Sequence, residues 1–305
     1  MSTDLRHAAR DYVALRRALG YQLRGYDRFL DDLAADLERA GAAVLTIELA
    51  LAWATKPADV PPFRWKVRLG IARGFGRYLQ TLDPATQVPP TNLLAFRRSR
   101  PAPYLYRPTE IQALLQATDT LTPALRAATY RTLLGLLAVT GMRVGEALAL
   151  DRDNVDLRER RLVIRHAKGG GRQLPLHPST ARELASYARV RGQLCRAPKT
   201  PSFFVSTVAT RPIYECVRET FCELRAITGL DTRHPLPRIH DLRHSFAVET
   251  LLGWHRTDVD VAARLPLLGA WMGHRHPAST YYYLQAAPEL LALAAQRLPD
   301  LGIRS

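Results

Sequence analysis

The sequence has little lysine, little cysteine and no long apolar run. Only 4 of its 43 basic residues are lysine, so arginine carries nearly all of the positive charge. The 3 cysteines are odd in number and follow no zinc-binding spacing, which argues against a disulfide framework and predicts a reducing compartment. No stretch of about 18 apolar residues could span a membrane, and the N-terminal MSTDLRHAARDY lacks the apolar core of a signal peptide. We therefore expect a cytoplasmic protein with no membrane partner.

Basic residues outnumber acidic residues in this chain. The chain of 305 residues has a net charge of +15 and a pI near 10.3. Such an excess in a soluble chain points first to a polyanion such as nucleic acid. Charge alone leaves open a basic enzyme without a polyanion partner. The length favours two domains.

The first 82 residues predict a small all-α domain. Apolar residues recur with the helical period, and Gly20 and Gly41 follow the first two such segments. The predicted helices cover residues 3–19, 22–40, 46–55 and 62–81. Residues 1–100 hold 16 basic and 10 acidic side chains, so this part of the chain is basic by itself.

Residues 83–103 contain five prolines and the basic positions Arg97, Arg98 and Arg100. A segment this rich in proline cannot continue a helix and predicts an extended linker. Such a linker would join two modules that bind one polyanion and raise their effective concentration on it.

Arg143 is the first candidate site residue. A largely apolar helix is predicted over residues 123–140, Gly141 ends it, and the next helix begins within residues 142–145. Arg143 then lies at a helix N-terminus, where backbone N–H groups favour an anion. A purely structural surface role is unattractive, because a cation at this end of a helix opposes the helix dipole.

Lys168 lies in a predicted β-hairpin. Short strands over residues 161–166 and 172–176 flank residues 167–171, which include three glycines. In a chain with so few lysines, one in this turn hints at a need for an ammonium that can give up a proton. A glycine-rich turn could instead hold a nucleotide phosphate, but GxxxxGK[ST] and GxGxxG are both missing.

His240 and Arg243 lie one turn apart on a helix predicted to begin near residue 239, so both can reach one phosphate. His240 and His244 also have a spacing found in zinc sites. Metalloprotease helices place glutamate directly after the first histidine, whereas this chain has Asp241 and no carboxylate cluster nearby. The sequence therefore predicts no metal site.

The stretch GAWMGHRHPASTYYYL, residues 269–284, brings two histidines close to three consecutive tyrosines. A phenol is a weak nucleophile at neutral pH because its ordinary pKa is about 10. Arginine and histidine neighbours would stabilise its anion or the transition state. Successive helical residues point about 100° apart, so only one of these tyrosines can face a given phosphate.

Arg143, Lys168, His240, Arg243, His274 and a terminal tyrosine occur in the order of a known signature. This ordered set resembles that of the tyrosine recombinase (phage integrase) family, in Xer-like forms carried by mobile elements. The resemblance covers residues 104–297 closely. It implies a mainly α fold: a helical core-binding domain over residues 1–82, and an α-rich catalytic domain with a small antiparallel β-sheet over residues 104–305.

The resemblance also implies the roles of the site residues. Arg143 and Arg243 would hold the scissile phosphate with His274, and Glu146 would support the site. Lys168 would protonate the leaving 5′ oxygen, and His240 would assist removal of the tyrosine proton. The family nucleophile lies nine residues after the histidine that here is His274, which selects Tyr283. The 3′-phosphotyrosine keeps the energy of the broken bond, so no cofactor is implied.

The implied partners are double-stranded DNA and further copies of the chain. In the family, a C-terminal helix docks on the next subunit of a cyclic tetramer, and Pro288–Ala295 fits such a helix. Candidate phosphate contacts in the fourth predicted helix are Arg64, Lys66, Arg68, Arg73 and Arg77.

Two alternatives from other classes are a type IB topoisomerase-like nicking and rejoining enzyme, and a DNA-binding protein that kept the fold without the reaction. All six catalytic positions are filled, which disfavours the second. The interval between His240 and His274 is longer than in Xer-type recombinases, with an insertion near Trp254–Asp260.

Overall fold

The computed structural model describes residues 4–23, 25–94, 102–165, 171–257 and 259–286. The chain divides into two compact units, Met1–Arg100 and Pro101–Ser305. Among the described residues, no helix is long and apolar enough to cross a membrane.

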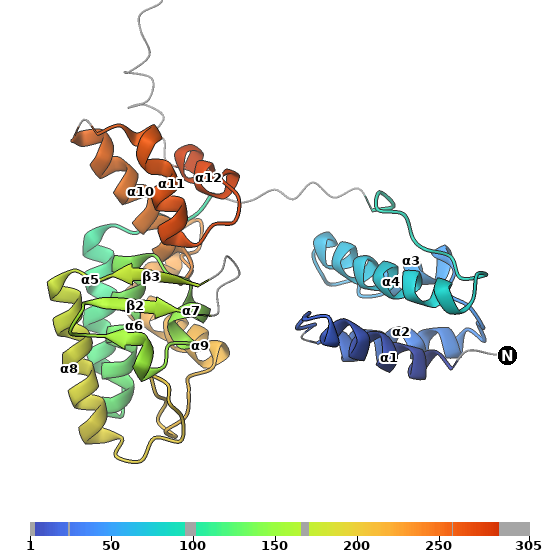
Figure 1. The fold of residues 1–305 in the computed structure, drawn as a ribbon, viewed down its shortest axis with the longest axis horizontal. Helices are drawn as coiled ribbons and strands as arrows, with labels where there is room; N and C mark the ends of the chain where they lie inside the picture. The colour runs from blue at the N-terminus through green and yellow to red at the C-terminus, as the bar shows by residue number, and fades with distance from the viewer. Residues whose placement is uncertain (1–3, 24, 95–101, 166–170, 258, 287–305) are drawn as a thin grey trace, which may run out of the picture. The chain divides into compact units, whose positions relative to one another are not determined.

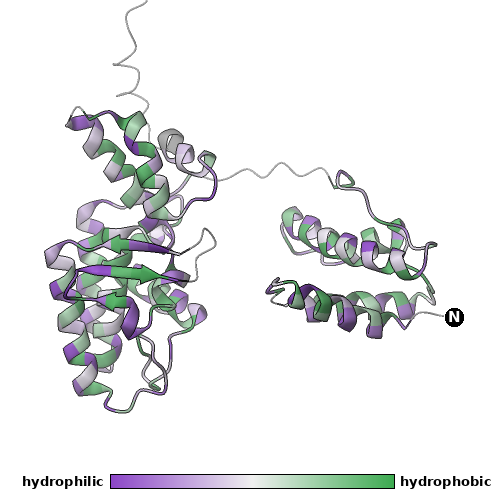
Figure 2. Ribbon diagram, in the orientation of Figure 1, coloured by the Kyte–Doolittle hydropathy of each residue, from purple (hydrophilic) through white to green (hydrophobic). Residues whose placement is uncertain are grey.

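The first unit is built from helices whose ends are set by local capping. The Asp4 carboxylate accepts from the backbone N–H groups that open the first helix, and the Thr46 hydroxyl does the same for the third. In Figure 2 these helices carry both hydrophobic and hydrophilic segments, as expected for helices with one buried face. Trp53 and Phe75 are among the largest side chains of the buried core. The helices are α1 (Leu5–Ala18), α2 (Tyr26–Arg39), α3 (Ile47–Thr55) and α4 (Pro62–Leu82).

The chain after α4 stays attached to this unit. The backbone N–H of Gln87 donates to the Leu45 carbonyl at 2.8 Å. Arg73 Nε and Nη2 donate to the carbonyls of Pro89 and Pro90 at 2.6 and 2.7 Å. Proline has no backbone N–H, and the guanidinium of Arg73 supplies donors to these two carbonyls. The first part of the predicted linker, as far as Pro90, therefore packs on the first unit.

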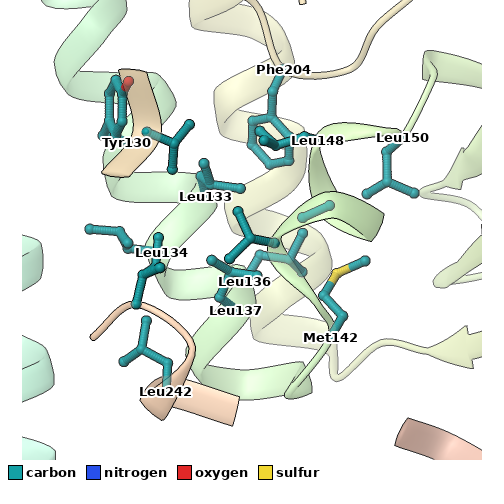
Figure 3. Close-up of a cluster of buried hydrophobic side chains, with 14 of the residues drawn as sticks. Tyr130, Leu133, Leu134, Leu136, Leu137, Met142, Leu148, Leu150, Phe204 and Leu242 are labelled. Atoms are coloured by element: carbon teal, nitrogen blue, oxygen red, sulfur yellow. The ribbon is translucent and has the colours of Figure 1, made fainter. Parts of the chain in front are cut away.

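The second unit is mainly helical. Its buried core surrounds α6, which is apolar on most sides, and includes Leu133, Leu137 and Phe204 (Figure 3). The helices before the C-terminal group are α5 (Pro108–Ala117), α6 (Ala124–Thr140), α7 (Val144–Leu148), α8 (Pro178–Leu194) and α9 (Tyr214–Ile227), with short 3₁₀ turns η1 (Thr118–Thr120), η2 (Arg152–Asn154) and η3 (Leu230–Thr232).

A small antiparallel sheet of order β1-β2-β3 packs on this core. Its strands are β1 (Val155–Asp156), β2 (Arg161–Ile164) and β3 (Arg172–Pro175). Ile164 pairs with Arg172, which fixes the register of the predicted hairpin. Leu162 and Leu174 face each other across the two strands and are fully buried.

The C-terminal helices gather at one end of the second unit (Figure 1). They are α10 (Asp241–Arg256), α11 (Val261–Met272) and α12 (Ala278–Ala286). Their apolar faces form a separate core cluster that includes Leu251, Leu268, Met272 and Tyr283. The insertion noted in the sequence falls at the end of α10 and the start of α11.

Candidate active site

Arg143 lies directly before α7, where the sequence predicts it. Its backbone N–H donates to Glu146 Oε2 at 3.0 Å, and its Nη1 lies 2.7 Å from Oε1. The buried Glu146 carboxylate thus offsets the cation at a helix N-terminus. Burial opposes ionisation of Glu146, but hydrogen bonds from Arg172 and from the Arg143 backbone lower its pKa to about 2.

Arg243 is held from two sides in the first turn of α10. Its side chain is buried, and Nη1 and Nη2 each donate at 2.6 Å, to the carbonyls of Gly141 and Met272. Gly141 ends α6 with a φ of 61°, and a Cβ there would collide with the Phe246 ring. Burial lowers the pKa of Arg243 to about 10, so the group stays charged at neutral pH.

Three consecutive carbonyls at the end of α11 hold three arginines from different elements. Arg172 Nε donates to the Trp271 carbonyl at 2.7 Å, Arg243 to that of Met272, and Arg143 Nη2 to that of Gly273 at 3.1 Å. A helix C-terminus presents unpaired carbonyls and a partial negative charge, which suits cations. The end of α11 therefore fixes the relative positions of Arg143 and Arg243.

His274 follows directly and contacts both the arginine cluster and α12. Its Nε2 lies 3.0 Å from Arg243 Nη2, and its Nδ1 lies 2.8 Å from Thr280 Oγ1. Burial and the charge of Arg243 lower the pKa of His274 to about 4, so its ring is neutral at pH 7. Its ring stacks on that of Tyr283, with centroids 5.8 Å apart and planes at 21°.

The three tyrosines of α12 have different surroundings. Tyr281 is exposed, Tyr282 is half-buried, and Tyr283 is buried beside His274. Burial raises the pKa of Tyr283, and the charge of Arg243 opposes that rise. The Tyr283 phenol is therefore protonated at rest. This arrangement favours Tyr283 as the nucleophile.

His240 occupies the N-cap position of α10, and its ring lies next to that of His244. Their ring centroids are 5.1 Å apart, and the His244 ring also approaches that of Tyr283 at 5.4 Å. Burial, aided by Arg243, lowers the pKa of His240, which keeps it neutral and able to accept a proton. In the described ranges, no cluster of three or more His, Cys, Asp or Glu side chains could hold a metal.

Arg172 is a site residue that the sequence analysis missed. Besides the Trp271 carbonyl, it binds Glu146 through Nη1 and Nη2 at 3.1 and 2.8 Å. Arg172 lies on the same face of β3 as the buried Leu174. The alternation of residues along a strand could therefore have predicted from the sequence that Arg172 faces the core. A charged residue on a buried strand face needs a partner of opposite charge. Lys168 lies outside the described residues.

The predicted DNA contacts on α4 separate into two groups. Arg68 stacks over Trp53 at 3.9 Å and donates to the Trp53 carbonyl and to Asp32, and Arg73 binds the proline carbonyls described above. These two arginines thus take part in packing within the first unit. Arg64, Lys66 and Arg77 are exposed.

Comparison with known proteins decides the family. The sequence model that describes the phage integrase family matches residues 105–289, which is more than half of the chain. The chain belongs to the phage integrase family. The prediction from the ordered motif is thereby confirmed, and the protein is a tyrosine-type site-specific recombinase.

Similar proteins include integrases and Xer recombinases. The y4rB protein of Sinorhizobium fredii (strain NBRC 101917 / NGR234), whose name places it with integrases and recombinases, is 42% identical over 307 residues, 98% of each chain. Tyrosine recombinase XerC of Alcanivorax borkumensis is 27% identical, covering 90% of this recombinase and 80% of XerC.

Solved structures show the same fold. The XerH recombinase bound to palindromic difH substrate matches with a TM-score of 0.67 at 18% identity, over 90% of this chain and 79% of XerH. The Tn1549 transposon integrase with transposon right end DNA matches with a TM-score of 0.66 at 16% identity, over 95% and 99%. The predicted fold, mainly α with a small antiparallel sheet, is confirmed.

Proposed function

We propose that this recombinase cuts and rejoins double-stranded DNA through a 3′-phosphotyrosine formed on Tyr283. The observation that carries the proposal is the stacking of Tyr283 on His274, whose Nε2 lies 3.0 Å from Arg243 Nη2. A phenol, a neutral imidazole and a buried guanidinium thus lie next to one another.

Arg143 and Arg243 would bind the non-bridging oxygens of the scissile phosphate. Guanidinium groups suit this role because they present several donors in a fixed plane. Their hydrogen bonds to carbonyls at the end of α11 hold both groups in place before DNA arrives. Donors fixed in advance stabilise the developing charge without reorganisation during the reaction. Glu146 supports Arg143 and is itself held by Arg172.

The chemical step needs a base and an acid. The Tyr283 hydroxyl oxygen attacks phosphorus, the bond from phosphorus to the 5′ oxygen breaks, and the phenol proton leaves with help from the neutral His240. Lys168, which lies between β2 and β3 in the sequence, would give its proton to the 5′ oxygen. Attack by that 5′ hydroxyl, or by one from another strand, reverses the step, so no metal or nucleotide is required.

DNA binding would involve both units and several copies of the chain. The net charge of +15 and the DNA complexes of XerH and the Tn1549 integrase support duplex DNA as the partner. On α4, Lys66 and Arg77 lie three turns apart on one face, and Arg64 lies on the opposite side. We propose Lys66 and Arg77 as phosphate contacts, a tetramer joined through residues 288–305, and a cytoplasmic location.

The test uses a duplex selected for binding from a randomised pool. In a nicked form of this duplex, cleavage releases the short fragment that carries the 5′ hydroxyl, so the strand cannot be rejoined. This form should trap a covalent complex with the recombinase in excess EDTA and without nucleotide. Two selected duplexes of different length should then exchange strands. Covalent trapping without strand exchange would favour a topoisomerase-like enzyme, and no trapping on any selected duplex would favour a non-catalytic DNA-binding protein.

A further inference from the structure

The two ring nitrogens of His274 have partners with different hydrogen-bonding capacity. Arg243 Nη2, 3.0 Å from Nε2, can only donate. Thr280 Oγ1, 2.8 Å from Nδ1, can donate or accept. A neutral imidazole carries one proton, so the arginine contact places that proton on Nδ1. In the protein without DNA, the Thr280 hydroxyl therefore accepts a hydrogen bond from Nδ1.

The role that the family resemblance implies for His274, a hydrogen bond to the scissile phosphate, requires the other tautomer. To stabilise a phosphate oxygen, His274 must donate from Nε2, because Nδ1 faces Thr280. A proton on Nε2 is incompatible with donation from Arg243 Nη2 to the same atom. The phosphate oxygens would therefore accept hydrogen bonds from both donors, the guanidinium N–H of Arg243 and the Nε2–H of His274. Nδ1 then becomes an acceptor and needs a donor.

We propose that Thr280 is a positioning residue whose hydroxyl supports both tautomers of His274 and so allows the ring to become a phosphate donor. The inference rests on the proposed function of the site. Without a phosphodiester, the hydroxyl accepts from Nδ1–H. With a phosphodiester, the hydroxyl turns and donates to Nδ1. One proton passes from Nδ1 to Nε2, so the charge of the ring does not change.

The surroundings of Thr280 fit this role. The residue is 2% exposed, so bulk water cannot replace its hydroxyl. A Cβ at Gly269 would lie 3.1 Å from Thr280 Oγ1, so the glycine leaves the space in which the hydroxyl meets His274. Thr280 and Tyr283 lie one turn apart on α12. The same hydroxyl thus ties the helix of the nucleophile to His274.

Two kinds of measurement test the inference. In protein labelled with ¹⁵N-histidine, long-range ¹H–¹⁵N correlation spectra distinguish the two tautomers, and His274→Gln assigns the signal. We expect an Nδ1–H tautomer in the free protein. When the selected duplex is added to the Tyr283→Phe variant, the His274 ring should change to the Nε2–H tautomer. An Nδ1–H tautomer that persists in the DNA complex would overturn the inference.

The second measurement is the rate of covalent trapping on the nicked duplex. Thr280→Val keeps the shape and removes the hydroxyl, and we expect trapping to slow about tenfold or more with DNA affinity retained. Thr280→Ser should recover the rate to within about threefold. Equal rates for the wild type and Thr280→Val would contradict the inference while leaving the proposed function intact. If wild-type protein forms no covalent complex, the proposed function itself fails. If Thr280→Val does not fold, the tautomer spectra with and without DNA decide.

Discussion

Arg172 and Glu146 form a two-point ion pair across the active site. Nη1 and Nη2 of the guanidinium lie 3.1 and 2.8 Å from Oε1 and Oε2, and the two side chains are 10% and 5% exposed. The pair joins the first residue of β3 to α7. Glu146 also binds Arg143, so one carboxylate aligns two arginines from separate elements.

Removal of Arg172 should therefore destabilise the second unit. Arg172→Ala leaves a buried carboxylate with Arg143 as its remaining cation, and we expect a loss of about 3 kcal/mol in the free energy of unfolding. Arg161→Ala is a matched control on the neighbouring strand. Its partner Asp156 lies 3.3 Å away in an exposed pair, which should contribute less than about 1 kcal/mol. Urea denaturation of both variants checks this, and equal losses would contradict the assignment.

The stability of the protein should depend on pH partly through His244, beside the contributions of His240 and His274, whose pKa values are also lowered by burial. Its Nδ1 is buried without a hydrogen-bond partner among the described residues, and burial lowers the pKa of His244 to about 4. An unfolded histidine titrates near pH 6.5, so the unfolded chain binds more protons between these values. The stabilising contribution is complete above about pH 6.5 and is lost as the pH falls toward about 4.

His244→Phe should flatten this decline, because phenylalanine keeps the ring contacts and has no group to protonate. The measurement is the free energy of unfolding from urea titrations at several pH values between about 4 and 7. His7→Phe, in an exposed position on α1, is the control. A decline as steep in His244→Phe as in the wild type would show that other groups cause it.

DNA affinity should fall steeply with salt, because neutralised phosphates release counterions. Replacing both Lys66 and Arg77 by alanine should reduce the slope of log K against log salt by about 1.8, or about 0.9 for each phosphate that is no longer neutralised. Arg64→Ala, on the opposite side of α4, should change the slope little. Fluorescence anisotropy at several salt concentrations gives the slopes. A slope change for Arg64→Ala as large as the change per residue in the double variant would contradict the assignment of the phosphate contacts to one face of α4.

Deletion of residues 288–305 should impair assembly more than DNA binding. The tail is expected to dock on the next subunit, and a head-to-tail contact of this kind closes a ring. Gel-shift assays would separate single-site binding from the paired complex of two duplexes. Equal losses of both would indicate that the tail packs on its own subunit.

Much of the site could be predicted because its chemistry uses rare residue types at fixed spacing. Arg143 follows a glycine that ends a helix, and His240 and Arg243 lie one turn apart in the structure as in the prediction. Helical geometry predicted that only one of the three tyrosines faces the site, and the spacing of the family signature from His274 selected Tyr283. These features depend on local sequence, which the chain itself displays.

The missed features depend on contacts between distant segments. Arg172 cannot be recognised as a site residue until Glu146, 26 residues earlier in the chain, is placed beside it. The helix α11 contains Pro266, which normally disfavours a helix interior, so packing against α10 and α12 overrides the local signal. Arg68 and Arg73 were predicted to contact DNA because the sequence alone does not show that they bind backbone carbonyls of the first unit.

The trapping of a covalent complex by single tyrosine variants tests the account most directly. Tyr283→Phe should keep the fold and DNA affinity and abolish the covalent complex on the nicked duplex. Tyr281→Phe and Tyr282→Phe should leave the complex largely formed, because their side chains do not stack on His274. A covalent complex that forms with Tyr283→Phe and disappears with Tyr282→Phe would contradict the account.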